Sequence, residues 1–195
     1  SATVLEETPA VSADGRYVAY SASQNAHAQI FLRDTCEGAA ANCKAQTTVI
    51  SVAADGTPGN DDSSAPSMSA DGRYVAFSSA ATNLAENAAA GRQIYLRDTC
   101  AGASADSKCS PATQILSVDP NGALTGAENL LPSVSASGRF VAFLAVTPSH
   151  AAHGSSAGAT AAPAKNSGYL QVFVRDTCLG APRCPPKTSL ISLQP

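Results

Sequence analysis

The sequence predicts an all-β fold made of short antiparallel strands in a repeated sheet. Three observations support this prediction. A block of nine residues occurs three times, at residues 12–20, 69–77 and 135–143. Each copy opens with turn-forming residues and continues into an apolar stretch. β-branched and aromatic residues fill the shared blocks, whereas Gly, Asn, Asp and Pro fill the segments between them.

Composition limits the kinds of partner. The 195 residues are 44% hydrophobic and only 14% charged, so the chain can bury a core under a surface of small polar residues. The net charge of −3 provides no basic field for nucleic acid, and none is expected as a partner. No apolar run approaches the roughly 20 residues of a membrane helix, so no membrane span is expected.

Two further blocks follow the first in every copy. The second block begins with Gln and ends with Arg-Asp-Thr-Cys; it occupies residues 29–36, 93–100 and 171–178. The third block ends with Ser and occupies residues 48–51, 114–117 and 189–192. A proline precedes each unit, at Pro9, Pro66 and Pro132. Spacing varies mostly in one loop, so the strands are the constant part.

Each unit is expected to contain four strands. In the second unit these are residues 66–69, 73–78 and 93–97, and a strand centred on Ile115 and Leu116. Asp-Gly between the first two strands predicts a tight hairpin, because glycine adopts positive φ without steric cost. Ser137 replaces the Asp in the third copy, which the same turn tolerates.

The second strand is apolar on both sides. Tyr74 and Ala76 lie on one face, and Val75 and Phe77 lie on the other. Both faces of the sheet are therefore expected to be covered. A repeated four-stranded sheet of this kind is a β-propeller blade.

The combined pattern resembles the TolB-like propeller repeat, also called the PD40 or WD40-like repeat. The resemblance rests on P-x-x-S-x-[DS]-G-R-[YF]-V-A-[YF] followed by [IV]-[FY]-[LV]-R-D, and covers residues 9–193. The added cysteines are similar to those of a subgroup of secreted bacterial repeats without assigned activity. The resemblance implies a fold and carries over no catalytic residue. It implies one repeat domain over residues 1–195, whose blades span about 9–52, 66–118 and 132–193.

Three blades are fewer than the four to eight that usually close a propeller. Two chains could complete a six-bladed ring, chains could add head to tail into a filament, or the chain could be a fragment of a longer propeller. Residues 1–8 are expected to be an N-terminal strand or tail. Within them, residues 2–5 resemble a fourth strand and could pair with another edge by strand addition. The expected partners are therefore further copies of the chain or further blades.

Each unit carries two cysteines, and the repeat relates them. The first cysteine always follows Arg-Asp-Thr. The second always lies seven positions before the aliphatic residue that directly precedes the final Ser of the third block. This pattern predicts the disulfides Cys36–Cys43, Cys100–Cys109 and Cys178–Cys184. The alternative is a zinc site, but the cysteine spacings and the absence of an adjacent His do not suit one. Disulfides predict an extracellular, cell-surface or periplasmic location.

Other candidate groups are less specific. His150 and His153 could bind a metal, but exposed loop residues are the favoured interpretation, as for His27. Asp61 and Asp62 lie in an oxygen-rich turn that lacks the spacing of a calcium loop. No metal and no cofactor are therefore predicted.

A Gly-x-Ser-x-Gly match at residues 154–158 lies in the low-complexity loop 147–168, without the strand and helix that a nucleophile elbow requires.

Several polar residues and glycines recur once per blade. An active site needs one asymmetric constellation, so these are interpreted as structural residues that tie strand ends and adjacent blades. They are Gly15, Arg16, Gly72, Arg73, Gly138 and Arg139, together with Arg33, Asp34, Arg97, Asp98, Arg175 and Asp176.

The functional hypothesis is a non-enzymatic structural protein outside the cytoplasm whose blades self-associate into a ring or filament. One alternative is a propeller that binds a protein or glycan ligand through the loops between its second and third strands. Another is the propeller part of a larger secreted hydrolase.

Overall fold

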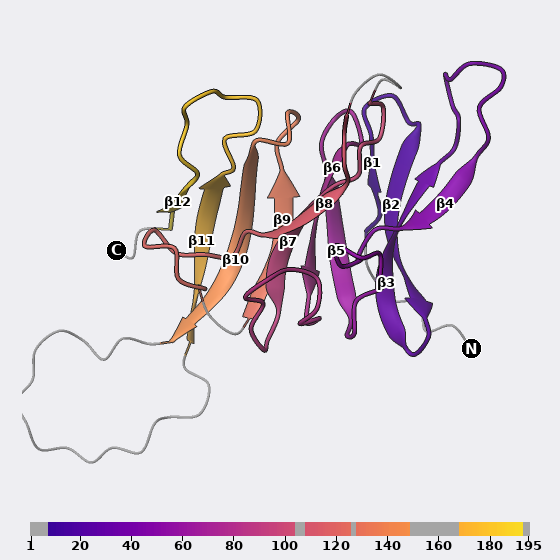
Figure 1. Cartoon of the computed structure of the whole chain (residues 1–195). Helices are drawn as coiled ribbons and strands as arrows, with labels where there is room; N and C mark the ends of the chain where they lie inside the picture. The colour runs from indigo at the N-terminus through magenta and orange to yellow at the C-terminus, as the bar shows by residue number, and fades with distance from the viewer. Residues whose placement is uncertain (1–7, 104–107, 126–127, 149–167, 193–195) are drawn as a thin grey trace, which may run out of the picture.

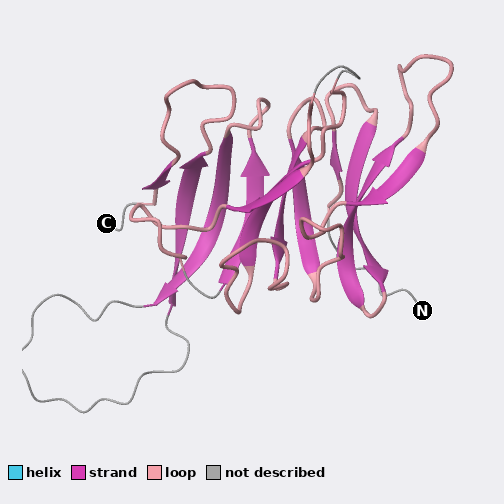
Figure 2. Cartoon of the chain, viewed as in Figure 1, coloured by secondary structure: helices cyan, strands magenta, loops and turns pink. Residues whose placement is uncertain are grey.

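A computed structural model describes residues 8–103, 108–125, 128–148 and 168–192. These residues form three four-stranded antiparallel sheets that stand side by side (Figure 1). No helix occurs among them (Figure 2), and hence none that is long and apolar enough to cross a membrane. The all-β prediction and the three-blade prediction are confirmed.

Each sheet is a meander whose strands follow in chain order. Blade 1 contains β1 (Ala10–Val11), β2 (Tyr17–Gln24), β3 (His27–Asp34) and β4 (Gln46–Val49). Blade 2 contains β5 (Ser63–Met68), β6 (Tyr74–Ser79), β7 (Gln93–Asp98) and β8 (Ala112–Ile115). Blade 3 contains β9 (Glu128–Val134), β10 (Phe140–Pro148), β11 (Gly168–Asp176) and β12 (Lys187–Leu190).

The fourth strand of blade 2 ends earlier than predicted. Leu116 still donates its N–H to the Ile94 carbonyl at 2.7 Å. The Ile94 N–H, however, donates to the Ser117 hydroxyl at 3.1 Å instead of a backbone carbonyl. The hydroxyl in turn donates to Oε1 of Gln93 at 2.6 Å. The Ser117 side chain therefore replaces a backbone carbonyl as the hydrogen-bond acceptor of Ile94. The strand is centred on residues 113–114 rather than on Ile115 and Leu116.

The first strand of blade 2 begins earlier than predicted. The sequence pattern predicts that it starts at Pro66. In the structure the strand begins at Ser63, and its pairing with β6 shifts register between Ser64 and Ser67. Ala65 has φ of 50°, so Pro66 lies at a β-bulge, where its missing N–H costs no ladder hydrogen bond.

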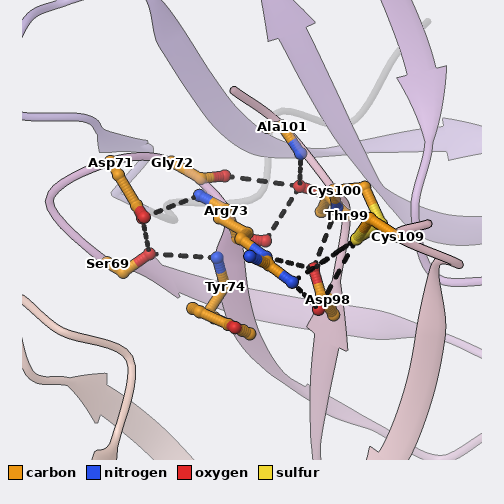
Figure 3. A network of polar contacts seen from close by, with 10 residues as sticks. All are labelled: Ser69, Asp71, Gly72, Arg73, Tyr74, Asp98, Thr99, Cys100, Ala101 and Cys109. Carbon is orange, nitrogen blue, oxygen red and sulfur yellow. Dashed lines mark hydrogen bonds and ion pairs between the residues drawn. A yellow bond between two sulfur atoms is a disulfide. The ribbon is translucent and has the colours of Figure 1, made fainter. Parts of the chain in front are cut away.

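The turn between the first two strands is built from the shared block. In blade 2 the Ser69 hydroxyl donates to the Asp71 carboxylate at 2.5 Å, and the Arg73 amide donates to it at 3.0 Å (Figure 3). Gly72 has φ of 74°, the left-handed conformation that the sequence predicts. In blade 3 Ser137 replaces the Asp, and both contacts lengthen to 3.4 Å.

Two apolar clusters lie between neighbouring blades. We call the face of a blade that points to the next blade its forward face, and the opposite face its rear face. Ile30 and Leu32, on the forward face of blade 1, cluster with Phe77 and Tyr95, on the rear face of blade 2. Blades 2 and 3 meet through a second cluster formed in the same way. Both faces of blade 2 are covered, as predicted.

At each junction between blades, a tyrosine ring of one blade packs against the turn glycine of the next blade. A Cβ added at Gly72 would lie 2.8 Å from Cγ of Tyr17 in the preceding blade. A Cβ added at Gly138 would lie 2.7 Å from Cγ of Tyr74. The same turns are hydrogen-bonded to one another, since Ala13 N–H donates to the Ala70 carbonyl at 2.8 Å and Ala70 N–H donates to the Ala136 carbonyl at 3.0 Å.

This contact predicts a position-specific cost of adding one methyl group. Gly72→Ala should destabilise the fold by about 1–3 kcal/mol more than Gly122→Ala, because only the first overpacks against a ring. Gly122 is the matched control, since it also has positive φ but, in the part of the chain that the structure describes, no atom lies within 4 Å of the added Cβ. Urea unfolding of both variants measures the difference, and equal destabilisation would contradict the proposed contact.

Candidate functional site

One end of every blade carries an ion pair beside a disulfide. In blade 2 the Arg73 guanidinium donates Nε–H and Nη2–H to the two oxygens of Asp98 at 2.9 and 2.8 Å (Figure 3). The guanidinium carbon lies 5.0 Å from the centre of the Tyr74 ring, a cation–π contact. Arg16–Asp34 and Arg139–Asp176 repeat the arrangement in the other two blades.

The six cysteines form three disulfides within the blades. The bonded pairs are Cys36–Cys43, Cys100–Cys109 and Cys178–Cys184, the pairs that the repeat predicts. In blade 2 the Asp98 carboxylate also accepts the Cys100 N–H at 3.0 Å, so ion pair and disulfide share one carboxylate. Because each sulfur is used in an S–S bond, these groups do not provide thiolate ligands for zinc.

The ion pairs lower the pKa of all three carboxyl groups. Two hydrogen bonds from Arg139 lower the pKa of Asp176 to about 2. The pKa of Asp34 is lowered mainly by its hydrogen bonds from Arg16. Burial pushes the pKa of Asp98 upward, but the hydrogen bonds from Arg73 and Cys100 outweigh it. Carboxylates held ionised in this way suit a structural ion pair rather than a general acid.

The second recurring arginine also acts inside its own blade. Arg33, Arg97 and Arg175 donate to Thr47, Thr113 and Thr188 at 3.2, 2.9 and 3.1 Å. These contacts join neighbouring strands of one blade. Arg97 also lines the space between blades 1 and 2, and its partner Thr113 donates its hydroxyl to the Val52 carbonyl at 3.0 Å. Backbone hydrogen bonds between turns and two apolar clusters also join the blades.

His27 meets two carboxylates that the sequence treated separately. Its Nδ1 lies 3.7 Å from Oδ1 of Asp62 and 3.9 Å from Oδ1 of Asp61. The same Asp62 oxygen accepts the Ala28 N–H at 2.8 Å, which joins blade 1 to the segment that enters blade 2. All three side chains are substantially exposed, so we interpret the group as part of this junction. His150 and His153 lie outside the described residues, as do residues 2–5 and 154–158.

A cavity of about 310 Å³ lies between blades 1 and 2 at the disulfide end. Its walls include Leu32, Val49 and Ile50 from blade 1, and Arg97 and Pro111 from blade 2. Arg97 donates to Thr113, and its pKa is lowered because it is half-buried. The described lining combines neither a nucleophile with a base nor two free carboxylates, so it provides no catalytic set.

The forward face of blade 3 is open where the equivalent faces are covered. Ile50 and Leu116 are 4% and 1% exposed because the next blade covers them, whereas Ile191 at the same repeat position is 53% exposed. Tyr17 is 6% exposed, whereas its equivalent Phe140 is 42% exposed. The third forward face therefore keeps the residues of a blade–blade interface and leaves them in contact with solvent.

The rear face of blade 1 is open in the same way. Val11 is 61% exposed, whereas its equivalents Met68 and Val134 pack against the cluster of the preceding blade. The rings of Tyr20 and Phe31 stack with their centres 5.7 Å apart. The equivalent pairs Phe77–Tyr95 and Phe143–Phe173 stack at 5.8 and 5.7 Å and are buried. The open rear face is thus already arranged as the covered ones are.

Comparison with known proteins shows the fold. The chain matches TolB from Acinetobacter baumannii with a TM-score of 0.51 and 17% identity. It has the TolB-like propeller fold. The match covers 97% of this chain but 33% of the TolB chain, so the chain spans about a third of that protein's length. A putative TolB from Agrobacterium tumefaciens aligns with a TM-score of 0.49 and 18% identity, over 94% of this chain and 50% of its own.

No protein-family model matches the chain, and the comparison with curated proteins found no match. The similarity therefore shows the architecture and names no activity. The two open faces, which sequence reasoning anticipated from the number of blades, are the candidate functional site.

The ion pair between Arg139 and Asp176 predicts that the stability of the fold depends on pH. Because the pKa of Asp176 is lowered to about 2 from an ordinary value of about 3.9, its ion pair stabilises the fold fully above pH 4. This contribution is lost as the pH falls through about 2. The stability difference between the wild type and Asp176→Asn should therefore shrink from pH 5 to pH 2 in urea unfolding. A difference that stays constant over this range would contradict the assignment.

Removal of a disulfide should lower the free energy of unfolding independently of the ion pair. Replacing both Cys100 and Cys109 by Ser should lower the free energy of unfolding by about 2–3 kcal/mol, as expected for short closed loops. The β fold should remain, since the clusters between blades do not involve these sulfurs. Urea unfolding and far-ultraviolet circular dichroism measure the two effects, and unchanged stability would show that the disulfide contributes nothing.

Proposed function

We propose that this chain is a non-enzymatic assembly module that acts outside the cytoplasm and binds further copies of itself through its two open blade faces. The observation that carries the proposal is the contrast at one repeat position. Ile50 and Leu116 are buried between blades, and Ile191 is exposed on the forward face of blade 3. A partner that presents a blade would bury it.

Hydrophobic burial is the driving force for this association. Full burial of a large aliphatic or aromatic side chain contributes about 1.5–3 kcal/mol. Phe140, Leu170 and Ile191 are exposed on the forward face of blade 3, and Val11 is exposed on the rear face of blade 1. Exposed apolar residues on a sheet face are typical of a protein-binding surface.

The location follows from the cysteines. Disulfides persist in oxidising compartments and are rare where thiols are kept reduced. Every described cysteine is paired, and each pair is repeated at the same place in its blade. We therefore place the protein at the cell surface, in the medium or in a periplasm.

The recurring polar groups support a structural role. Each arginine–aspartate pair occurs once per blade with nearly the same geometry. A group that is needed equally in every blade stabilises the repeat, whereas catalysis needs one asymmetric set. Two three-bladed copies would make a six-bladed ring, within the usual propeller range, and open addition would make a filament.

The proposal predicts a mass larger than that of one chain. Sedimentation of the purified protein should give about 39 kDa for a two-chain ring, twice 19.6 kDa, or a concentration-dependent series for a filament. Ile191→Asp should reduce the mass to 19.6 kDa, because association would then bury the unpaired Asp carboxylate in the interface.

Leu131→Asp is the matched control, since Leu131 is also exposed but lies at the bulge of the edge strand β9. It should leave the assembly intact. A wild-type protein that remains at 19.6 kDa at high concentration would overturn the proposal.

A further inference from the structure

We infer that copies join head to tail: the forward face of blade 3 in one copy packs on the rear face of blade 1 in the next, in the register that joins blades within the chain. This inference rests on the proposed function and specifies the geometry of its interface. The partner is a second copy, because this chain's own rear face is built to receive its own forward face.

The turn glycines provide the first argument. Gly72 and Gly138 are covered by rings of the preceding blade, so a Cβ has no room at either position. Gly15 has nearly the same φ, 76°, yet no atom of the described residues lies within 4 Å of an added Cβ. Phe140 follows the same series as Tyr17 and Tyr74 and is the ring at the other end. The ring of Phe140 on blade 3 and the glycine Gly15 on blade 1 are therefore the members of the series that do not pack on each other within the chain. Head-to-tail packing of two copies places Phe140 of one copy on Gly15 of the next.

The backbone gives a second, independent argument. Along the stack, the N–H of one turn donates to the carbonyl of the next, from Ala13 to Ala70 and from Ala70 to Ala136. The series ends with the Ala136 N–H on the forward side and the Ala13 carbonyl on the rear side. These are a donor and an acceptor, so the same register adds one more hydrogen bond of the same kind between copies.

The same groups disfavour two like faces meeting. Two forward faces would bring Phe140 against Phe140 with no glycine to receive either ring. They would also bring together two Ala136 N–H donors. Two rear faces would bring together two Ala13 carbonyls and two uncovered glycines. Only the head-to-tail arrangement matches ring with glycine and donor with acceptor, and it permits both a closed ring and a filament.

One repeat position, occupied by Ser21, Ser78 and Leu144, differs between the interface that joins two copies and the interfaces within a chain. Ser21 and Ser78 donate their hydroxyls to the next blade, to the carbonyls of Ser63 at 3.1 Å and Asn129 at 2.7 Å. The equivalent residue in blade 3 is Leu144. The interface between copies therefore replaces a hydroxyl donor by an aliphatic side chain and is more apolar than the internal interfaces.

The first test is a matched pair of glycine substitutions. Gly15→Ala places a methyl group where Phe140 of the next copy would lie, and it should weaken self-association about tenfold or more. Gly56→Ala is the control, since Gly56 also has positive φ and no described neighbour within 4 Å of the added Cβ. It should associate as the wild type does. Equal association of both variants, measured by sedimentation, would overturn the register.

The second test mixes two single-face variants. Val11→Asp disables the rear face, and Ile191→Asp disables the forward face; both positions are exposed in one chain, so the fold should survive, as circular dichroism can verify. Each variant alone should be a monomer. Their equimolar mixture should form a heterodimer of about 39 kDa, twice 19.6 kDa, because one intact face of each kind remains.

The outcomes separate the two proposals. If the wild type self-associates but one variant alone still does so, like faces meet and the head-to-tail inference is wrong. If both variants are monomers and the mixture is also monomeric, the inference is wrong as well. If the wild type itself is a monomer, the proposed function fails with it. Heterodimer formation from two monomeric variants supports the inference.

Discussion

The structure depends on one constraint: each sheet is apolar on both of its faces. A sheet of this kind needs a neighbour on either side, and blade 2 is the only one that has both among the described blades. Its forward residues Ile94 and Leu116 and its rear residues Val75 and Phe77 are all buried. The outer blades satisfy the constraint on one side each, and their remaining faces expose Val11, Phe140 and Ile191.

The polar groups hold each blade together but leave the choice of neighbour to packing. The arginine–aspartate pair and the disulfide lie at one end of every blade and join strands of the same sheet. They keep strand ends in place, and the arginine of each pair also stacks on the aromatic ring that follows it in sequence. The contacts between blades are instead rings on glycines, buried aliphatic side chains and backbone hydrogen bonds between successive turns. Contacts within a blade and contacts between blades therefore share this ring: Tyr17 and Tyr74 each lie under an arginine of their own blade and on a glycine of the next.

Much of the fold was predictable because the repeat compares the chain with itself. Three aligned copies separate constant strands from variable loops, and they pair each Arg-Asp-Thr-Cys with a second cysteine. Strand ends were less predictable. The fourth strand stops where Ser117 hydrogen-bonds the Ile94 amide, and the first strand extends through a bulge at Ala65 and Pro66. Neither a side chain that replaces a backbone partner nor a bulge has a periodicity that sequence patterns detect.

The sequence by itself determined the number of sheets, the apolar character of both faces of their strands and the cysteine pairs. These follow from local spacing and from composition. Only the tertiary structure decided which side chains meet across blades. It brought His27 to Asp62, placed the ring of Tyr17 on Gly72 and left Phe140 and Gly15 uncovered at opposite ends. The reason is that contacts between blades depend on the rotation of one sheet against the next, which no single strand encodes.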